Sequence, residues 1–331
     1  MKHFLPRINT NSGVAKFQQL VNSIEDAVAS NLLTVGDPLP SVNKLCSELK
    51  LSRDTVFKAY SELKSRGIVE SFPNKGYFIA SDRSGVFLFL DTFKAYKEVL
   101  YGAFRKSMPH NYTVDLHFHH YNIDVFRTIL TNAIGKYTHY IVMGFDHPEM
   151  KELLKMINKD KLLIIDWNIH ASPEHSFVCQ DFGRPVLDNL TLALPELDKY
   201  KKLIYLYPEF TFHPKESITY FNRFCEQHNI NGEVLYNAEL LNPQKGEAYF
   251  LVSDRTLARL LDLIHIKKLK IGEEIGIVSY NETPMKKYVK EGITVISTDF
   301  NALGKEAAQF VADSKPVQKY ISTSLIKRAS L

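Results

Sequence analysis

Two serines, Ser41 and Ser52, constrain the fold of this chain more than any other feature of its sequence. Each stands directly before a short segment in which apolar residues recur at helical spacing, the position where a serine hydroxyl caps the first turn of a helix. Gly36–Pro40 breaks the chain before the first cap, and only Lys50 and Leu51 separate the two predicted helices. So short a link indicates two helices packed across each other.

The flanking segments complete a small domain. Apolar spacing predicts a further helix over about 16–31, and Gly67 is placed to end the helix that Ser52 begins. Two β-prone runs, 68–72 and 77–80, flank turn residues and predict a hairpin. Helix, short helix, turn, longer helix and hairpin together make a winged helix-turn-helix.

Several short motifs in this region match a known pattern: Gly36-Asp37-Pro38-Leu39-Pro40-Ser41, Leu51-Ser52-Arg53-Asp54-Thr55-Val56, Tyr60, Leu63, Arg66-Gly67-Ile68-Val69 and Asn74-Lys75-Gly76-Tyr77-Phe78. Over about 14–80 the chain closely resembles the DNA-binding domain of the GntR family. The resemblance implies that residues 1–80 bind double-stranded DNA and that 52–66 is the recognition helix, whose first residues meet base edges in the major groove.

The side of this helix that faces away from its apolar stripe carries Arg53, Asp54, Phe57 and Lys58. Arginine can contact guanine through two hydrogen bonds or bind phosphate. Hydroxyls and backbone N–H groups at helix starts suit phosphate, and the hairpin tip suits the minor groove or the DNA backbone. The candidate DNA contacts are therefore Ser41, Asn43, Ser52, Arg53, Asp54, Thr55, Phe57, Lys58, Lys75 and Gly76.

Two of these candidates depart from the family pattern, since Asn43 and Phe57 stand where well-known members have arginine. Phe57 is suited to a thymine methyl group. The alternative for each charged candidate is ordinary solvated surface. For Asp54 it is an interaction with the helix dipole.

After a polar linker at 81–85, strands alternate with helices. The first series has apolar strands at 86–90, 113–118, 140–143 and 162–166, and helices at 95–108, 124–136 and 149–157. A second series has strands at 203–207, 232–236, 248–252, 275–279 and 294–297, and helices at 216–228, 255–264 and 301–312. Repeated βα units imply parallel sheets covered on both faces. The expected fold class is α/β, with two Rossmann-like lobes behind the winged helix-turn-helix and a ligand cleft between the lobes.

Motifs at the strand ends of this region follow a recognisable order: Val178–Gly183, Phe250–Asp254, Ile275–Glu282, Ile296–Asp299, Leu303–Ala308 and Thr323–Arg328. Over about 86–329 they resemble the effector domain of the LacI/GalR family, itself similar to periplasmic sugar-binding proteins. A GntR head joined to such a sensor is the arrangement of AraR-type regulators. The resemblance implies that 86–331 is an effector-binding and dimerisation domain for a monosaccharide such as arabinose or fucose.

Sugar sites need polar groups that pair with hydroxyls and flat apolar faces for the ring, and the strand-end loops supply both. The candidate effector contacts are Asp91, Phe93, Trp167, Asp181, Phe182, His213, Lys215, Ser253, Asp254 and Asn281. Asp and Asn at strand ends also serve as caps or turn residues, and Trp167 is equally suited to core packing. An arginine that the LacI family often has in the loop after Tyr207 is absent. His119 and His120 have no third ligand at a suitable spacing, so we expect no metal site.

The composition of the chain limits the classes of protein to which it can belong. The chain has 331 residues and a formal net charge of +4; residues 1–83 hold 11 Lys/Arg against 8 Asp/Glu, and residues 84–331 hold 30 against 29. The basic excess therefore lies in the first quarter. Three widely spaced cysteines exclude a disulfide framework or a cysteine-rich zinc site. The sequence contains neither a signal-peptide core nor an apolar run of about 18 residues, so we expect a cytoplasmic protein that does not contact membranes.

The sequence thus predicts a transcriptional regulator of carbohydrate utilisation genes, with a repressor as the expected direction. It would act as a homodimer on a palindromic operator and respond to a monosaccharide. One alternative is a GntR-headed, enzyme-like regulator with pyridoxal phosphate, but too few residues follow the head and no catalytic motif is present. The other is a plain sugar-binding protein. We expect no enzymatic activity and no cofactor.

Overall fold

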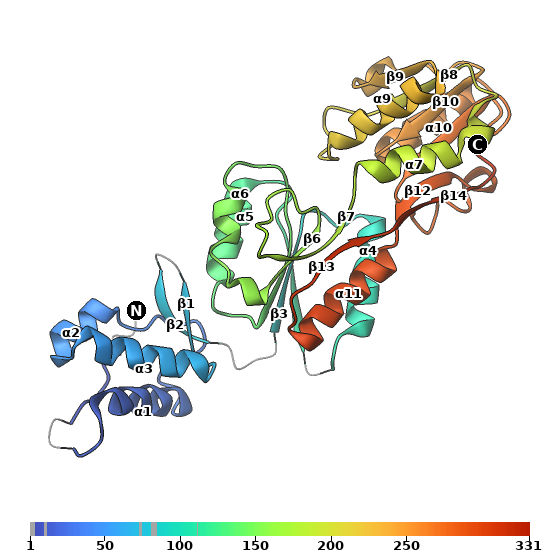
Figure 1. Ribbon diagram of the computed structural model, residues 1–331. Helices are drawn as coiled ribbons and strands as arrows, with labels where there is room; N and C mark the ends of the chain where they lie inside the picture. Colours follow the sequence, from blue (N-terminus) through green and yellow to red (C-terminus); the bar gives the residue numbers. More distant parts are fainter. Residues whose placement is uncertain (1–3, 10–11, 73–74, 81–84, 111) are drawn as a thin grey trace.

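The computed structural model describes residues 4–9, 12–72, 75–80, 85–110 and 112–331. It shows three units in a row, a small N-terminal head followed by two α/β lobes (Figure 1). The expected fold class is confirmed. Residues 81–84 of the predicted linker and Pro73-Asn74 of the hairpin turn lie outside the described residues.

The head has the predicted order of elements. Its helices and strands are α1 (Lys16–Ala29), α2 (Val42–Leu49), α3 (Arg53–Ser65), β1 (Val69–Phe72) and β2 (Gly76–Ile79). The strands pair antiparallel, with Val69 opposite Ile79. Gly67 follows α3 with a φ of +71°, a left-handed conformation that glycine adopts without steric cost. The helices and strands bury one shared apolar core, so the head has a core of its own.

The first lobe is a six-stranded parallel sheet in the order β13-β7-β6-β5-β3-β4. Its strands are β3 (Gly85–Leu90), β4 (Thr113–Phe118), β5 (His139–Met143), β6 (Leu162–Asp166), β7 (Ser176–Gln180) and β13 (Gln318–Ile321). Its helices are α4 (Ala95–Ser107), α5 (Ile123–Ala133), α6 (Met150–Leu154) and α11 (Phe300–Asp313). Alternate side chains of β3 enter the two cores on opposite faces of the sheet, which explains why the whole strand is apolar.

The second lobe has the sheet order β14-β12-β11-β10-β8-β9. Its strands are β8 (Lys202–Leu206), β9 (Gly232–Leu235), β10 (Glu247–Leu251), β11 (Ile275–Tyr280), β12 (Thr294–Thr298) and β14 (Thr323–Ile326). Its helices are α7 (Arg184–Leu192), α8 (Leu194–Leu197), α9 (Glu216–His228) and α10 (Asp254–Ile266). Only β14, at the edge, runs antiparallel to its neighbour.

The chain crosses between the lobes three times, after β7, after β12 and between β13 and β14. Hydroxyl bonds join the crossing segments, because Thr298 Oγ1 donates to Gln180 Oε1 at 2.9 Å and lies 2.7 Å from Thr323 Oγ1. The second crossing corrects the sequence analysis, which placed the helix at 301–312 in the second series. That helix, α11, packs against α4 of the first lobe, where a Cβ on Gly304 would lie 2.4 Å from the Leu100 carbonyl oxygen.

Candidate functional sites

The open side of α3 carries the predicted DNA contacts. Arg53, Asp54, Phe57 and Lys58 are all exposed, and the Phe57 side chain is 42% accessible although it is apolar. The Arg53 guanidinium carbon lies 5.9 Å from the centre of the Phe57 ring, and the Lys58 ammonium lies 4.1 Å from that of Phe17. These aromatic rings support two cations on one surface of the head.

The serines at the helix starts act as caps. Ser41 Oγ accepts the Lys44 N–H and Ser52 Oγ accepts the Thr55 N–H, both at 3.2 Å. Ser52 Oγ also lies 2.8 Å from Thr55 Oγ1, and Asn43 is exposed on the first turn of α2. The hydroxyls are therefore held at the starts of the two helices.

The hairpin of the head carries charged side chains both at its turn and on its first strand. Lys75 and Gly76 lie at the start of β2, and partial burial lowers the pKa of Lys75. On β1 the buried Glu70 carboxylate forms an ion pair with Lys161 of the first lobe. One ion pair therefore joins the head to the sensor.

A cavity of about 410 Å³ lies between the two lobes, at the carboxyl ends of their strands. Seven predicted effector contacts line it: Asp91, Trp167, Phe182, His213, Ser253, Asp254 and Asn281. Three do not line it. Phe93 packs edge-on against Tyr101 and Phe118, Asp181 accepts the Gly183 N–H at 2.8 Å, and Lys215 is exposed before α9.

The cavity has further lining residues that the sequence analysis missed, among them Lys94, Tyr96, Tyr121, Asp166, Gln180, Phe210, Phe212, Arg255 and Tyr280. Asp166 and Gln180 end β6 and β7, so the strand-end rule that selected Asp91 also applies to them. Nothing in the sequence pattern distinguishes Tyr121 or Phe212. They lie in loops of different lobes, and only the fold brings them together.

Carboxylates lie deep in the first-lobe wall. The Asp91 carboxylate forms an ion pair with the fully buried Lys97 ammonium and accepts the Tyr121 hydroxyl. Burial lowers the pKa of Lys97 to about 8, against the opposing effect of Asp166. Burial also raises the pKa of Asp166, while Lys97 and a hydrogen bond from Gln180 oppose that rise. This wall holds carboxylate oxygens whose positions are fixed by neighbours.

The second-lobe wall presents buried polar atoms that no other described residue satisfies. These atoms are His213 Nε2, the Tyr280 hydroxyl and Asn281 Oδ1. Burial lowers the pKa of His213 to about 3, so its imidazole is neutral at physiological pH. An unsatisfied buried polar group costs roughly 1–3 kcal/mol. This wall is therefore suited to a ligand rich in hydroxyl groups.

Flat rings complete the cavity. Tyr121 of the first lobe and Phe212 of the second stack with centroids 3.8 Å apart and an interplanar angle of 3°. Trp167 meets Phe182 nearly edge-on at 6.1 Å. The Tyr121–Phe212 stack bridges the two lobes beside the cavity.

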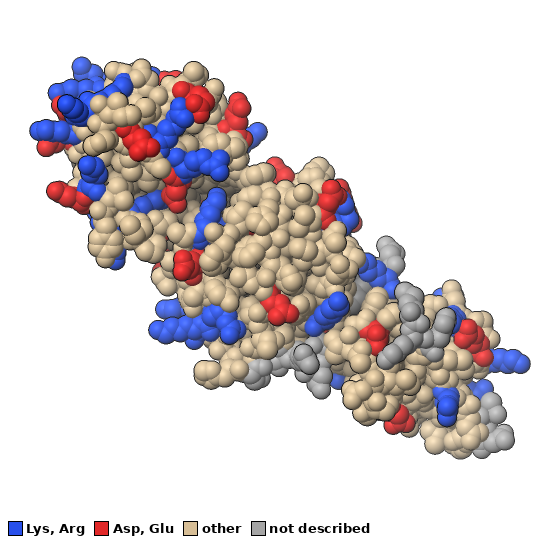
Figure 2. Space-filling view, turned by 180° about the vertical axis from the view of Figure 1, so that it is seen from behind, with Lys and Arg blue, Asp and Glu red and all other residues tan. Residues whose placement is uncertain are grey.

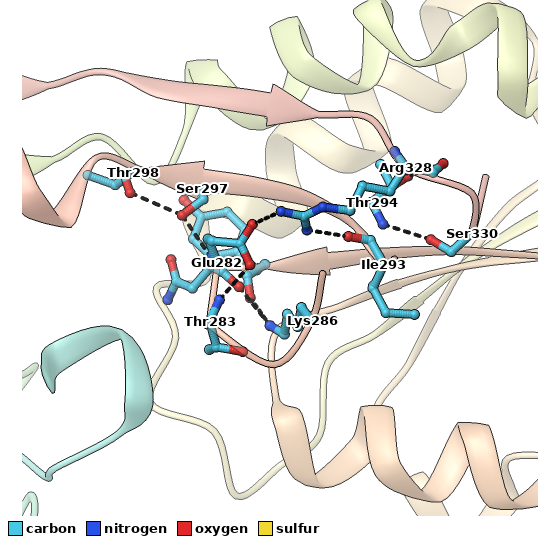
Figure 3. A network of polar contacts seen from close by, with 11 residues as sticks. Glu282, Thr283, Lys286, Ile293, Thr294, Ser297, Thr298, Arg328 and Ser330 are labelled. Carbon is cyan, nitrogen blue, oxygen red and sulfur yellow. Dashed lines mark hydrogen bonds and ion pairs between the residues drawn. The ribbon is translucent and has the colours of Figure 1, made fainter. Parts of the chain in front are cut away.

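A polar network behind the second-lobe wall fixes the loop that follows β11 (Figure 3). Arg328 forms an ion pair with Glu282 and donates to the Ile293 carbonyl at 2.7 Å. Glu282 in turn accepts the Thr283 N–H, and its own N–H donates to Ser297 Oγ, each at 2.8 Å. The C-terminal segment is thereby tied to the loop that carries Asn281.

Two parts of the chain match known protein families. Residues 16–79 match the gntR family of bacterial regulatory proteins, and residues 198–331 match the periplasmic binding protein-like domain. The uncharacterized HTH-type transcriptional regulator YhcF of Bacillus subtilis is 35% identical over 92 residues, which cover 28% of this chain and 74% of YhcF. The chain belongs to the GntR family.

This GntR-family chain spans only part of several curated relatives. The HTH-type transcriptional repressor YtrA of Bacillus subtilis is 29% identical over 76 residues, 23% of this chain and 58% of YtrA. The match covers 14% of YcxD from the same organism and 61% of the Mycobacterium tuberculosis regulator Rv1152.

Solved structures resemble the sensor. The trehalose repressor of Escherichia coli superimposes with a TM-score of 0.60 at 14% identity, over 73% of this chain and 100% of that one. A LacI family regulator from Lactobacillus casei with bound sucrose gives 0.63 at 14% identity, over 75% and 99%. Identities this low show the fold alone, which is the periplasmic-binding-protein-like fold of LacI-type regulators.

Among the described residues, no group of three or more His, Cys, Asp or Glu side chains could hold a metal ion. None of their helices combines the length and hydrophobicity that a membrane crossing requires.

Proposed function

We propose that this GntR-family protein is a repressor of carbohydrate utilisation genes, which binds a palindromic operator as a homodimer and responds to a monosaccharide. The observation that carries the proposal is the cavity of about 410 Å³ between two sensor lobes of a chain that begins with a GntR head. Its volume is within the range of small-molecule sites, roughly 300–1,000 Å³. Arabinose and fucose are the first candidates.

The composition of the cavity wall supports a sugar. Asp91 and Asp166 supply fixed acceptors, while His213 and Tyr280 carry buried polar atoms without a partner in the described residues. Aromatic faces lie beside them, as a sugar ring requires. Charged side chains of both signs are interspersed over the second lobe in Figure 2, and no field of one sign covers that face.

Control of DNA binding would depend on the three chain segments that cross between the two lobes, because the lobes can change their arrangement only by moving about these segments. A ligand that contacts both walls favours the closed arrangement of the lobes over an open one, and only such differential affinity can shift the equilibrium. In a dimer, that shift would change the spacing of the two heads. A coupling of about 1–3 kcal/mol is sufficient to alter operator affinity five- to 150-fold. Such a role places the protein in the cytoplasm.

A gel shift with palindromic DNA from upstream of the gene tests the head. Arg53→Ala should weaken operator binding by about 10- to 100-fold, because a base contact by arginine contributes roughly 1–3 kcal/mol. Arg223→Ala removes the same charge from exposed α9 and should leave binding unchanged. Equal affinity of the two variants would refute the assignment of α3.

A thermal-shift screen tests the sensor. L-arabinose, L-fucose, D-xylose, D-glucose, D-galactose and their phosphates are added to the full chain, and a ligand at 100 times its dissociation constant should stabilise the fold by about 2.7 kcal/mol. Asp91→Asn should abolish the response to the active sugar. A flat response to every sugar would refute the effector proposal.

A further inference from the structure

Lys286 is buried beside the effector cavity without lining it. Its side chain is 3% exposed, and its ammonium lies 2.8 Å from Asp254 Oδ1. It donates to the backbone carbonyl oxygens of Tyr280 and Asn281 at 3.1 and 2.6 Å. An ammonium has three donors, so these contacts use all of them.

The three groups that Lys286 holds come from two different elements of the cavity wall. Tyr280 is the last residue of β11 and Asn281 directly follows it, whereas Asp254 is the first residue of α10. Tyr280, Asn281 and Asp254 all line the cavity. The loop that supplies Lys286 is fixed independently by the Arg328–Glu282 ion pair drawn in Figure 3.

We infer that Lys286 is a positioning residue of the effector site, one that sets effector affinity through Asp254 and Asn281 without contacting the effector. This inference rests on the proposed function. By holding one carboxylate oxygen of Asp254, the ammonium fixes the rotamer that decides where the other oxygen points. By holding two successive carbonyls, it fixes the backbone from which the Asn281 side chain projects.

The backbone at this point needs such support. Asn281 has a φ of +62°, a left-handed conformation that is unfavourable for most L-residues and that asparagine tolerates better than most. Such outliers persist where the surroundings hold them, and they gather at binding sites. The Lys286 ammonium binds the carbonyl oxygen of Asn281 itself and that of the preceding residue, Tyr280.

The contacts with Asp254 and the two carbonyls also explain why a lysine is tolerated in the interior. Burial lowers the pKa of Lys286, whereas Asp254 and Glu282 raise it and Arg328 lowers it further. A buried charge is strongly destabilising unless it is paired and hydrogen-bonded. Once Asp254 or the carbonyls move, the ammonium loses its compensation, so the wall keeps one geometry.

The test measures effector affinity by isothermal titration, with the sugar that most stabilises the wild-type protein in the screen above as titrant. Lys286→Met keeps the length and apolar stem of the side chain but removes the ammonium, and it should weaken binding at least about tenfold. Lys287→Met is the matched control, because Lys287 is exposed and its ammonium lies 4.7 Å from the centre of the Tyr288 ring. Lys286→Gln keeps two N–H donors on a shorter, uncharged side chain and should recover part of the affinity.

A double-mutant cycle with Asp254→Asn separates positioning from general stability. If Lys286 acts through Asp254, Lys286→Met should cost much less affinity in the Asp254→Asn background than in the wild type. Additive losses, or a Lys286→Met protein that binds like wild type, would overturn the inference and leave the proposed function standing. Should Lys286→Met fail to fold, Lys286→Gln is compared with Lys287→Gln in the same cycle. A wild-type protein that binds no sugar refutes the proposed function and this inference with it.

Discussion

The head and the first sensor lobe build their cores from the chain in opposite ways. The head closes its core from consecutive elements, α1 to β2, within residues 16–79. The first lobe needs two distant stretches, because α11 and β13 join a sheet that begins at Gly85. Local sequence therefore determines most of the head, whereas the lobe depends on contacts across more than half of the chain.

The contact between α11 and α4 gives the largest expected effect. Gly304→Val would force a side chain against the Leu100 carbonyl and the Phe104 amide, and overpacking of this kind costs about 3 kcal/mol. Hydrogen exchange followed by mass spectrometry should show faster exchange in first-lobe peptides and unchanged exchange in the head. Gly102→Val, with open space around it on α4, is the matched control. Loss of protection in the head as well would show that the two units unfold together.

A fall in pH should destabilise the sensor but not the head. Burial lowers the pKa of His119 and His213 to about 3 and that of His139 to about 4, and all three belong to the sensor. Because these values lie below the unfolded-state value, the unfolded chain binds protons first, and stability present above about pH 6.5 is lost as the pH falls toward these values. We expect each of these histidines to cost the sensor about 1 kcal/mol of stability between pH 7 and pH 5.5.

The sequence of the head contains no histidine between residues 4 and 80. Hydrogen exchange at both pH values, corrected for the intrinsic exchange rate, should therefore show destabilisation in sensor peptides alone. An equal loss in the head would contradict the histidine explanation.

A smaller effect tests whether a local change in the head alters the stability of the head alone. Ser52→Ala removes the hydroxyl that caps α3 and should destabilise the head by about 1 kcal/mol. Ser61→Ala, at an exposed position on the same helix, should change little. Urea unfolding followed by exchange in head peptides measures both. A cap effect that spreads to the sensor would weaken the contrast between the two regions.

The smallest effect concerns the contact between lobes. Phe212→Ala removes the ring that stacks on Tyr121, and such pairs contribute about 0.5–1.5 kcal/mol beyond their buried area. We expect effector affinity to fall a few-fold while the melting temperature without sugar barely changes. Leu192→Ala, exposed on α7, is the control. A large drop in melting temperature would mean that the stack serves folding instead of closure.

The sequence predicted elements well where local rules decide. The caps at Ser41 and Ser52, the hairpin and the nine strands listed for the two series lie within a few residues of their expected bounds. It failed where a contact is purely tertiary. The periodicity of 301–312 is the same whichever lobe the helix covers, and β13 is a short, mostly exposed strand without an apolar run.

The same limit applies to the cavity. Strand-end logic placed Asp91, Ser253, Asp254 and Asn281 on its wall, because carboxyl ends of parallel strands meet at one edge of a sheet. It did not find Lys286, since a lysine between Met285 and Lys287 has the pattern of solvated surface. Only the fold shows that this ammonium is buried.

The late return of the chain to the first lobe has a consequence for synthesis on the ribosome. The head is complete once residue 80 has emerged, but the first sheet lacks its edge strand until residue 321 is made. At the usual pace of about 5–20 residues per second, that interval lasts roughly 10–50 seconds. During this time a nascent chain would carry a finished DNA-binding head and an unfinished effector domain, so newly made molecules would be able to bind DNA before the proposed response to an effector is possible.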